Sequence, residues 1–195
     1  TGRLRHGVFE GLRGDRPARR VRLERPAGGG GGAAIAGIRL SNAGRVIFPA
    51  SGVTKRQLAR YHEAVADAML AVTADRPLSL LRHPSGLGEP GFFQRHAGQG
   101  FPDAIRTMPI TEGDGTREAY MYVTDAAGLV GAVQMGTIEV HIWGARRDRL
   151  ERPDRMVFDL DPDEGLGFDA VRGAAVDLRD HLAEIGLASL PLVTG

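Results

Sequence analysis

The sequence predicts a protein of the α/β or α+β class, and three observations support this class. Apolar residues recur at helical spacing after Thr54 and again after Phe168. Between these stretches, short apolar runs bounded by Gly, Pro and Asp are typical of strands. A further run, residues 156–162, alternates with a period of two and ends in acidic residues. Helices and strands are therefore mixed along the chain.

Three regions are expected along the chain. Residues 1–25 hold too little apolar material for a domain, and we interpret them as the remnant of a preceding module. Residues 26–37 contain five consecutive glycines and have the composition of a flexible linker. Residues 38–195 then form the domain that carries the function.

A helix is expected to begin at Thr54, because Thr54 and Gln57 have the spacing of a capping box. Pro77 closes this element. Apolar residues at steps of three and four define its expected buried face, which consists of Leu58, Tyr61, Val65, Ala68 or Met69, and Val72.

Four further segments have strand-like or moderately helical patterns: a strand over 78–82, a hairpin formed by 104–110 and 119–123, a helical stretch over 125–135 and a strand over 137–143. A second long helix begins near Phe168, and Gly186 is its expected stop. Its expected buried face consists of Phe168, Val171, Ala175, Leu178, Leu182 and Ile185.

The segment 156–162 is expected to be a strand whose apolar residues face a core. Strand alternation would place Asp159 and Asp161 together on the opposite face. Two neighbouring carboxylates repel each other, and a divalent cation removes that cost, because Mg²⁺ and Mn²⁺ prefer hard oxygen ligands. We therefore expect Asp159 and Asp161 to be catalytic and to hold metal for phosphoryl or nucleotidyl transfer.

The same acidic segment has three other interpretations. An EF-hand loop fails, because Glu164 stands where that loop needs Gly and Ala170 where it needs Glu. A phosphatase of the haloacid-dehalogenase type also places Asp-x-Asp after an apolar strand, and it stays open as an alternative. A strand that runs into an acidic surface turn is the structural alternative.

Composition restricts the function classes. Apolar residues make up 42% of the chain and charged residues 25%, and no apolar run approaches the ~20 residues of a membrane span. The absence of cysteine excludes a disulfide framework and a thiolate zinc site. A net charge of +1 does not indicate nucleic-acid binding, but Lys55 is the single lysine among 25 basic residues.

Asn42, Arg45 and Lys55 form a candidate phosphate site. Asn42 and Arg45 lie in a turn, and Lys55 lies in the first turn of the Thr54 helix. A helix N-terminus together with cations favours a bound phosphate. The alternative is a solvated surface lysine.

Two aromatic residues and a histidine are further candidates. In a strand, one ring of the pair Phe92 and Phe93 would be buried and the other exposed, where it could stack on a base. The alternative is that both rings pack into the core. A lone histidine such as His141 is by default a hydrogen-bonded structural residue.

Several ordered blocks resemble the polymerase domain of bacterial DNA ligase D, a member of the archaeo-eukaryotic primase superfamily that serves non-homologous end joining. The resemblance runs from about Ile38 to the last residue, and Gly7–Arg13 is similar to the end of the ATP-dependent ligase module. The blocks are Leu40–Pro49, Leu58–Tyr61, Arg82–Pro84, Phe92–His96, Gly136–Gly144 and Glu151–Pro162.

The resemblance implies a role for each candidate residue. Asp159 and Asp161 match the first two metal-binding aspartates of the family. Asn42, Arg45 and Lys55 match the pocket that binds the 5′-phosphate on the far side of a DNA gap or break. Phe92 and Phe93 match aromatic residues that stack near the template base, and His141 matches a histidine near the nucleotide site.

The resemblance also implies a primase-like fold, with a mixed sheet flanked by helices, and an activity. The activity is two-metal nucleotidyl transfer with Mn²⁺ or Mg²⁺ and nucleoside triphosphates. The implied partners are DNA ends and gaps with a 5′-phosphate, the ligase module of the same polypeptide and the bacterial Ku protein, in the cytoplasm at the nucleoid and not at a membrane. The third catalytic carboxylate is expected downstream of Gly195, so we expect this chain alone to have little or no activity.

Overall fold

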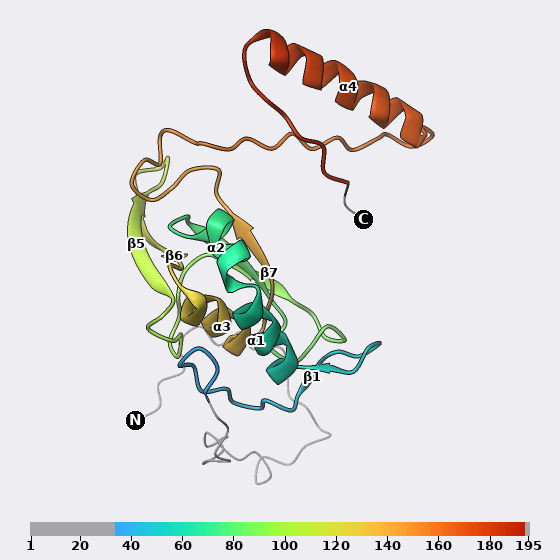
Figure 1. Cartoon of the computed structure of the whole chain (residues 1–195). Helices are drawn as coiled ribbons and strands as arrows, with labels where there is room; N and C mark the ends of the chain where they lie inside the picture. The colour runs from blue at the N-terminus through green and yellow to red at the C-terminus, as the bar shows by residue number, and fades with distance from the viewer. Residues whose placement is uncertain (1–33, 194–195) are drawn as a thin grey trace, which may run out of the picture. The chain divides into compact units, whose positions relative to one another are not determined.

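The computed structural model describes residues 34–193, and the chain divides into two compact units, one ending at Ile142 and the other beginning at Trp143 (Figure 1). The region expected at residues 1–25 lies outside the described residues, as does most of the expected linker.

The first unit contains seven strands and three helices in the part that the structure describes, which confirms the α/β class. In chain order they are β1 (Val46–Phe48), β2 (Val53–Thr54), α1 (Lys55–Ala64), α2 (Ala66–Thr73), β3 (Leu78–Arg82), β4 (Phe92–Gln94), β5 (Arg106–Thr111), β6 (Arg117–Tyr122), α3 (Ala126–Gln134) and β7 (Thr137–Ile142).

The main sheet is arranged around β3, which pairs with β4, β6 and β7. The hairpin expected in the middle of the chain is present as β5 and β6, and β1 pairs with β2 in a separate two-stranded sheet. Every ladder between the described strands is antiparallel, whereas the resemblance implied a mixed sheet.

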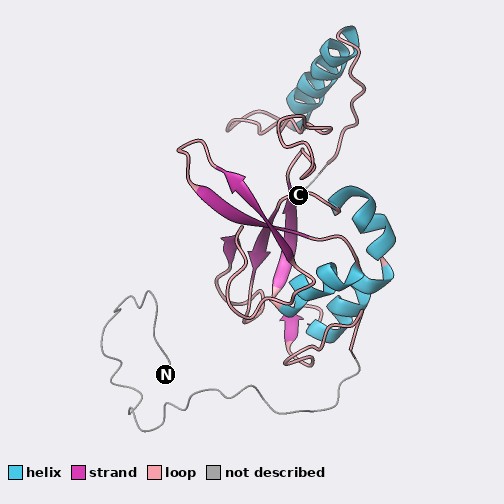
Figure 2. Cartoon of the chain, turned by 90° about the vertical axis from the view of Figure 1, so that its left-hand side faces the viewer, coloured by secondary structure: helices cyan, strands magenta, loops and turns pink. Residues whose placement is uncertain are grey.

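The core lies between the sheet and the helices α1–α3, which lie on one side of it (Figure 2). Leu78 and Leu80 of β3 point to the same face because side chains alternate along a strand, and both are fully buried. They pack with Met121 of β6 and Leu129 of α3. Each such side chain stabilises the fold by about 1.5–3 kcal/mol.

The capping box at Thr54 is confirmed, but the buried face expected for this helix is only partly right. Leu58 and Met69 pack against the core, whereas Tyr61 and Val72 are exposed. Thr54 accepts a hydrogen bond from the Gln57 amide, and the Gln57 side chain accepts one from Thr54. The helix ends at Ala64, and its buried residues are Lys55 and Ala59, while Tyr61 is 61% exposed. The buried face of α1 includes a lysine, so the spacing of apolar residues alone does not identify it.

The packed part of the unit begins before residue 38. Ile35 and Ile38 exchange backbone hydrogen bonds of 3.1 and 2.8 Å, and Ile35 is buried against Ala59 and Val130. Residues 35–37, which were expected to belong to the linker, are therefore part of the packed unit.

In the second unit, the strand expected over 156–162 is absent. This segment is irregular, and Met156, Val157 and Phe158 are exposed. Apolar alternation indicates extended backbone, but a strand also needs a partner for its N–H and C=O groups, and the described residues supply none.

Helix α4 (Phe168–Glu184) forms where expected, and Gly186 follows it with φ +80°. None of its residues is buried, so the face expected to be buried is wrong for the part of the chain that the structure describes. Within that same part, no helix is both long and apolar enough to cross a membrane.

Candidate functional site

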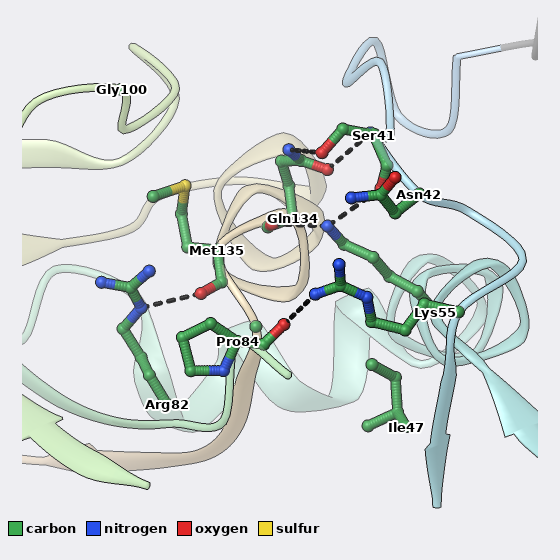
Figure 3. Close-up of a pocket in the computed structure, with 11 residues that line it drawn as sticks. Ser41, Asn42, Ile47, Lys55, Arg82, Pro84, Gly100, Gln134 and Met135 are labelled. Atoms are coloured by element: carbon green, nitrogen blue, oxygen red, sulfur yellow. Dashed lines mark hydrogen bonds between the residues drawn. The ribbon is translucent and has the colours of Figure 1, made fainter. Parts of the chain in front are cut away.

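A cavity of about 260 Å³ opens in the first unit where six pieces of chain meet. They are the turn before β1, β1 itself, the start of α1, the end of β3 with its following loop, the loop between β4 and β5, and the end of α3. Figure 3 shows the side chains that line it. The lining residues are Ser41, Asn42, Arg45, Ile47, Lys55, Arg82, Pro84, Gly100, Gln134, Met135 and Gly136.

Lys55 is the most buried cation of the cavity, with 7% of its surface exposed. Its Nζ donates to the carbonyl oxygens of Ser41 at 3.1 Å and Gln134 at 2.7 Å (Figure 3). Burial, followed by the nearby charges of Arg45 and Arg82, lowers the pKa of Lys55 from 10.5 to about 8. Its ammonium group therefore lacks a compensating negative charge.

Arg45 is fixed by the turn that precedes β1. Its backbone N–H donates to the Asn42 carbonyl at 2.9 Å, and its carbonyl accepts from the Lys55 N–H at 2.8 Å. Its Nη1 donates to the carbonyl of Pro84. Asn42 has φ +50°, a left-handed conformation that Asn tolerates better than most residues, so the turn sequence fits its geometry.

The C-terminus of α3 contacts both Lys55 and Arg82. Gln134 is the last residue of this helix, and its side chain exchanges hydrogen bonds with the backbone N–H and the hydroxyl of Ser41. Lys55 binds the Gln134 carbonyl, and Arg82 Nε binds the Met135 carbonyl at 2.7 Å. Cations stabilise the negative end of a helix dipole, so α3 holds both in place.

The cavity lining carries three cations and no carboxylate. Across residues 34–193, none of Arg45, Lys55 and Arg82 forms an ion pair with an acidic side chain. Buried cations are normally paired, because an uncompensated charge is costly in a protein interior. Such a cavity is suited to an anion with several acceptor oxygens, such as a phosphate group.

The structure brings together the predicted residues Asn42, Arg45 and Lys55, and the alternative of a solvated Lys55 is wrong. The sequence reasoning missed Arg82 and Gln134 as lining residues. Two features of the sequence could have indicated them. Arg82 ends a predicted strand, and Gln134 is a polar residue at the end of an otherwise apolar helical stretch.

Phe92 and Phe93 lie on opposite faces of β4, since neighbouring residues of a strand alternate. Phe92 pairs with Arg82 in the ladder, and Phe93 pairs with Leu81. Both rings are exposed, by 47% and 61%. The expectations that one ring or both would be buried are therefore wrong, because β4 is a short strand at the edge of the sheet order.

His141 of β7 lies beside Phe93. The two ring centres are 5.1 Å apart in an edge-to-face arrangement. His141 Nε2 lies 2.8 Å from a carboxylate oxygen of Glu139. Half of the His141 side chain is exposed, so the ring is held by neighbours on the sheet surface and remains accessible.

Asp159 and Asp161 belong to the second unit, in the irregular segment before α4, and both are exposed. Neither carboxylate has a hydrogen bond or ion pair with another described residue. Asp161 and Leu160 line a smaller cleft of about 150 Å³ together with residues of α4. These carboxylates are therefore available to a ligand.

The chemistry of the two aspartates fits a hard divalent cation, which takes one or two carboxylates and completes its shell with water and phosphate oxygens. No group of three or more His, Asp or Glu residues that could hold a metal ion occurs among residues 34–193. The described residues thus supply two exposed carboxylates and no complete metal cluster.

Together, these observations describe an α/β domain with a cavity lined by three cations and no carboxylate. The family described as LigD, primase-polymerase domain, matches residues 54–195. The chain belongs to this family. This confirms the resemblance drawn from the sequence, and the phosphatase of the haloacid-dehalogenase type is not retained.

Relatives and a solved structure agree with this assignment. The multifunctional non-homologous end joining protein LigD of Pseudomonas aeruginosa is 40% identical over the whole chain, and the corresponding protein of Mycobacterium tuberculosis is 33% identical over 81% of it. The chain spans only 24% and 22% of their lengths. A structure of the polymerase domain of M. tuberculosis ligase D in complex with DNA has a TM-score of 0.67 and 28% identity, over 81% of this chain and 57% of that one.

Proposed function

We propose that this chain binds the 5′-phosphate of a DNA gap or break, as part of a primase-type polymerase of bacterial non-homologous end joining. The observation that supports this proposal is the cavity with three cations and no carboxylate partner. In agreement, a relative of known structure was determined with DNA. A phosphate contact of this kind positions the protein on the end without reading its sequence.

Arg45 and Lys55 would contact a phosphate in different ways. Arg45 can offer a fork of donors, whereas Lys55 offers a compact charge with one N–H left after its two carbonyl contacts. Because burial has lowered the pKa of Lys55, an arriving dianion supplies the missing counter-charge and strengthens the protonated form. The pocket is fixed before the ligand arrives, so little free energy is lost in ordering it.

The reaction that we propose for the complete protein is nucleotidyl transfer to a primer 3′-hydroxyl, with nucleoside triphosphates as substrates. Asp159 and Asp161 would hold Mn²⁺ or Mg²⁺, which supplies activation of the 3′-hydroxyl and neutralisation of phosphate charge. His141 is a candidate for the nucleotide site. The ligase module of the same polypeptide and the Ku protein are the proposed partners, in the bacterial cytoplasm at the nucleoid.

For the 195-residue chain by itself we propose end binding with little or no nucleotide addition. The pocket lies entirely within the described residues, whereas those residues hold no metal cluster of three or more ligands. Incubation of the chain with Mn²⁺, nucleoside triphosphates and a primed gap should yield no extended primer. Extension that disappears in Asp159→Ala would overturn this part of the proposal.

The binding proposal is tested with gapped duplexes that differ only in a 5′-phosphate. The chain should bind the phosphorylated gap more tightly by about tenfold or more, because a charge-assisted contact contributes roughly 1.5–3 kcal/mol. Lys55→Met should remove most of this preference. Arg60→Met removes one charge from an exposed position of the same helix and should preserve the preference. Equal affinity of the unaltered chain for both duplexes would overturn the proposal.

A further inference from the structure

A loop rich in arginine, residues 144–155, lies near the start of the second unit and is called the basic loop below. It contains five arginines and three acidic residues, a surplus of two positive charges, whereas the whole chain has a net charge of +1. Four of the arginines are exposed, namely Arg147, Arg149, Arg152 and Arg155. The anion pocket and the proposed catalytic residues lie outside this loop.

Backbone hydrogen bonds close the basic loop at its base. The carbonyl oxygen of Gly144 accepts from the N–H groups of Asp154 at 3.0 Å and Arg155 at 3.2 Å. A side chain at position 144 does not fit, because its Cβ would clash with the backbone carbonyl oxygen of Arg155. The next residue, Ala145, is buried. The two ends of the loop are therefore held together, and the arginines project from a closed backbone.

Two consecutive turns set the spacing of three arginines. The N–H of Arg149 donates to the Arg146 carbonyl at 3.0 Å, and the N–H of Arg152 donates to the Arg149 carbonyl at 3.0 Å. A turn brings the Cα atoms of its first and fourth residues within about 7 Å of each other. Neighbouring phosphates of one DNA strand have a similar separation. The loop thus presents cations in a row with the spacing of a phosphate backbone.

The acidic residues of the loop neutralise this row only at one end. The Oδ2 atom of Asp154 lies 3.4 Å from Arg146 Nε and 3.9 Å from Arg149 Nη2. A long, solvated ion pair contributes little, so Arg149 can exchange this contact for another anion. The side chains of Asp148, Glu151 and Arg152 have no hydrogen bond or ion pair with another described residue. Arg149 and Arg152 are therefore accessible to a ligand.

We propose that the basic loop is a second DNA contact, which binds phosphates of the duplex backbone through Arg149 and Arg152. The inference rests on the proposed binding of DNA. Guanidinium groups bind phosphate oxygens through a planar fork of donors. A contact of this kind holds the duplex without reading its sequence and without need of a 5′-phosphate. The solved relative in complex with DNA favours a nucleic acid over an acidic protein as the partner.

The experiment measures the affinity of the 195-residue chain for gapped duplexes, with and without the 5′-phosphate, over a series of salt concentrations. Arg149→Gln combined with Arg152→Gln should weaken binding of both duplexes by the same factor, about tenfold. The slope of log K against log salt should become shallower by about 1.8, because each phosphate contact contributes about 0.9 to it. Unchanged affinity and slope in this double variant would overturn the inference.

Arg172→Gln combined with Arg179→Gln is the matched control. These arginines lie on α4 in the same unit, their side chains are 71% and 58% exposed, and their replacement removes the same charge. The control should change the slope by less than about 0.5. If both double variants weakened binding equally, net charge alone would explain the loss and the assignment to the basic loop would be wrong.

Gly144→Ala separates the arrangement of the arginines from their charge. The added Cβ opens the base of the loop and leaves every charge in place. Binding of both duplexes should weaken several-fold, and full affinity with an unchanged slope would contradict the inference. Should Gly144→Ala melt early in a thermal scan, the two arginine double variants decide the question.

The basic loop and the anion pocket can fail separately. If the unaltered chain does not distinguish phosphorylated from unphosphorylated gaps, but loses affinity and slope in the Arg149 and Arg152 variant, the pocket proposal is wrong and the basic loop stands. If the chain distinguishes the gaps and this variant has no effect, the pocket stands and the basic loop is wrong. Binding of poly-glutamate that is lost in the same variant, with DNA binding unchanged, would indicate an acidic protein partner and overturn the inference.

Discussion

The cation pocket of the first unit and the acidic segment of the second differ in how their charges are held. Lys55 is buried and makes two hydrogen bonds to backbone carbonyls, and Arg82 is fixed by two hydrogen bonds and two rings. Asp159 and Asp161 are exposed and have no partner among the described residues. The fold thus fixes the cations of the cavity, whereas no contact among the described residues fixes the two carboxylates.

The largest difference between the two units should appear when side chains are shortened. Leu80 in β3 is completely buried, whereas Val157 in the acidic segment is 82% exposed. Leu80→Ala should lower the free energy of unfolding by about 2–5 kcal/mol, because it leaves a cavity in the core. Val157→Ala should change it by less than about 0.5 kcal/mol. Chemical denaturation of the two variants gives both values.

The contrast would be lost if Val157→Ala proved as destabilising as Leu80→Ala. Val157 would then be buried in solution, and the acidic segment would be part of a packed core. A second exposed position, Leu192 at 85% exposure, provides the matched control.

Two glycines with positive φ sharpen the comparison. A Cβ on Gly136 (φ +79°) would lie 2.9 Å from Pro84 Cα, which is backbone of the pocket wall, whereas a Cβ on Gly165 (φ +91°) would meet nothing within 4 Å. Gly136→Ala therefore adds a backbone clash to the left-handed strain and should cost about 2–3 kcal/mol. Gly165→Ala should cost only the strain, about 1 kcal/mol. Thermal melts of both variants check the difference, and equal shifts would contradict a rigid pocket wall.

The pH dependence of phosphate binding should follow Lys55. Its pKa of about 8 in the free protein lies below the usual 10.5, because of burial and of the neighbouring arginines. A bound dianion raises that pKa, so affinity should be constant between about pH 7, where the phosphate is already a dianion, and about pH 8. Above pH 8 it should fall, by at most about tenfold per pH unit. Titration of the phosphorylated gap at several pH values measures the slope. Lys55→Met should abolish it.

The free energy of unfolding should rise with pH in the range where the affinity for phosphate falls. The folded pKa of Lys55 lies below the unfolded value, so between about pH 8 and 10.5 the unfolded state binds more protons. The cost of the buried charge is complete below pH 8 and is relieved as the pH rises. The free energy of unfolding of the unaltered chain should therefore increase relative to Lys55→Met across this window. A relative decrease would mean that Lys55 is stabilised as a cation in the free protein.

The elements that were predictable from the sequence are those with a local cause. The capping box at Thr54, the strand over 78–82 and the stop at Gly186 each depend on nearby residues, and each is present. The strand expected over 156–162 is absent because strand formation depends on a partner, and a partner is not encoded in the segment itself.

The lining of the pocket was likewise predictable only where its residues are close in sequence. Asn42, Arg45 and Lys55 lie close in sequence and could be grouped, but Arg82 and Gln134 reach the cavity only through the pairing of β3 with β7 and the position of α3. The opposite placement of Phe92 and Phe93 was available from strand alternation. The exposure of both rings was not, since it depends on the place of β4 in the sheet.

The smallest expected effects come from the helix N-termini. Thr54 caps α1 with its side chain, whereas Gly167 at the start of α4 has no side chain to do so. Thr54→Ala should destabilise the first unit by about 1 kcal/mol and weaken phosphate binding slightly, because α1 carries Lys55. Gly167→Ser should instead stabilise α4 by a few tenths of a kcal/mol, since a serine hydroxyl can accept a hydrogen bond from the first N–H groups of the helix. The helix content of the chain should rise accordingly. Far-ultraviolet circular dichroism against denaturant separates the two, and an unchanged signal in Gly167→Ser would mean that α4 begins at a different residue.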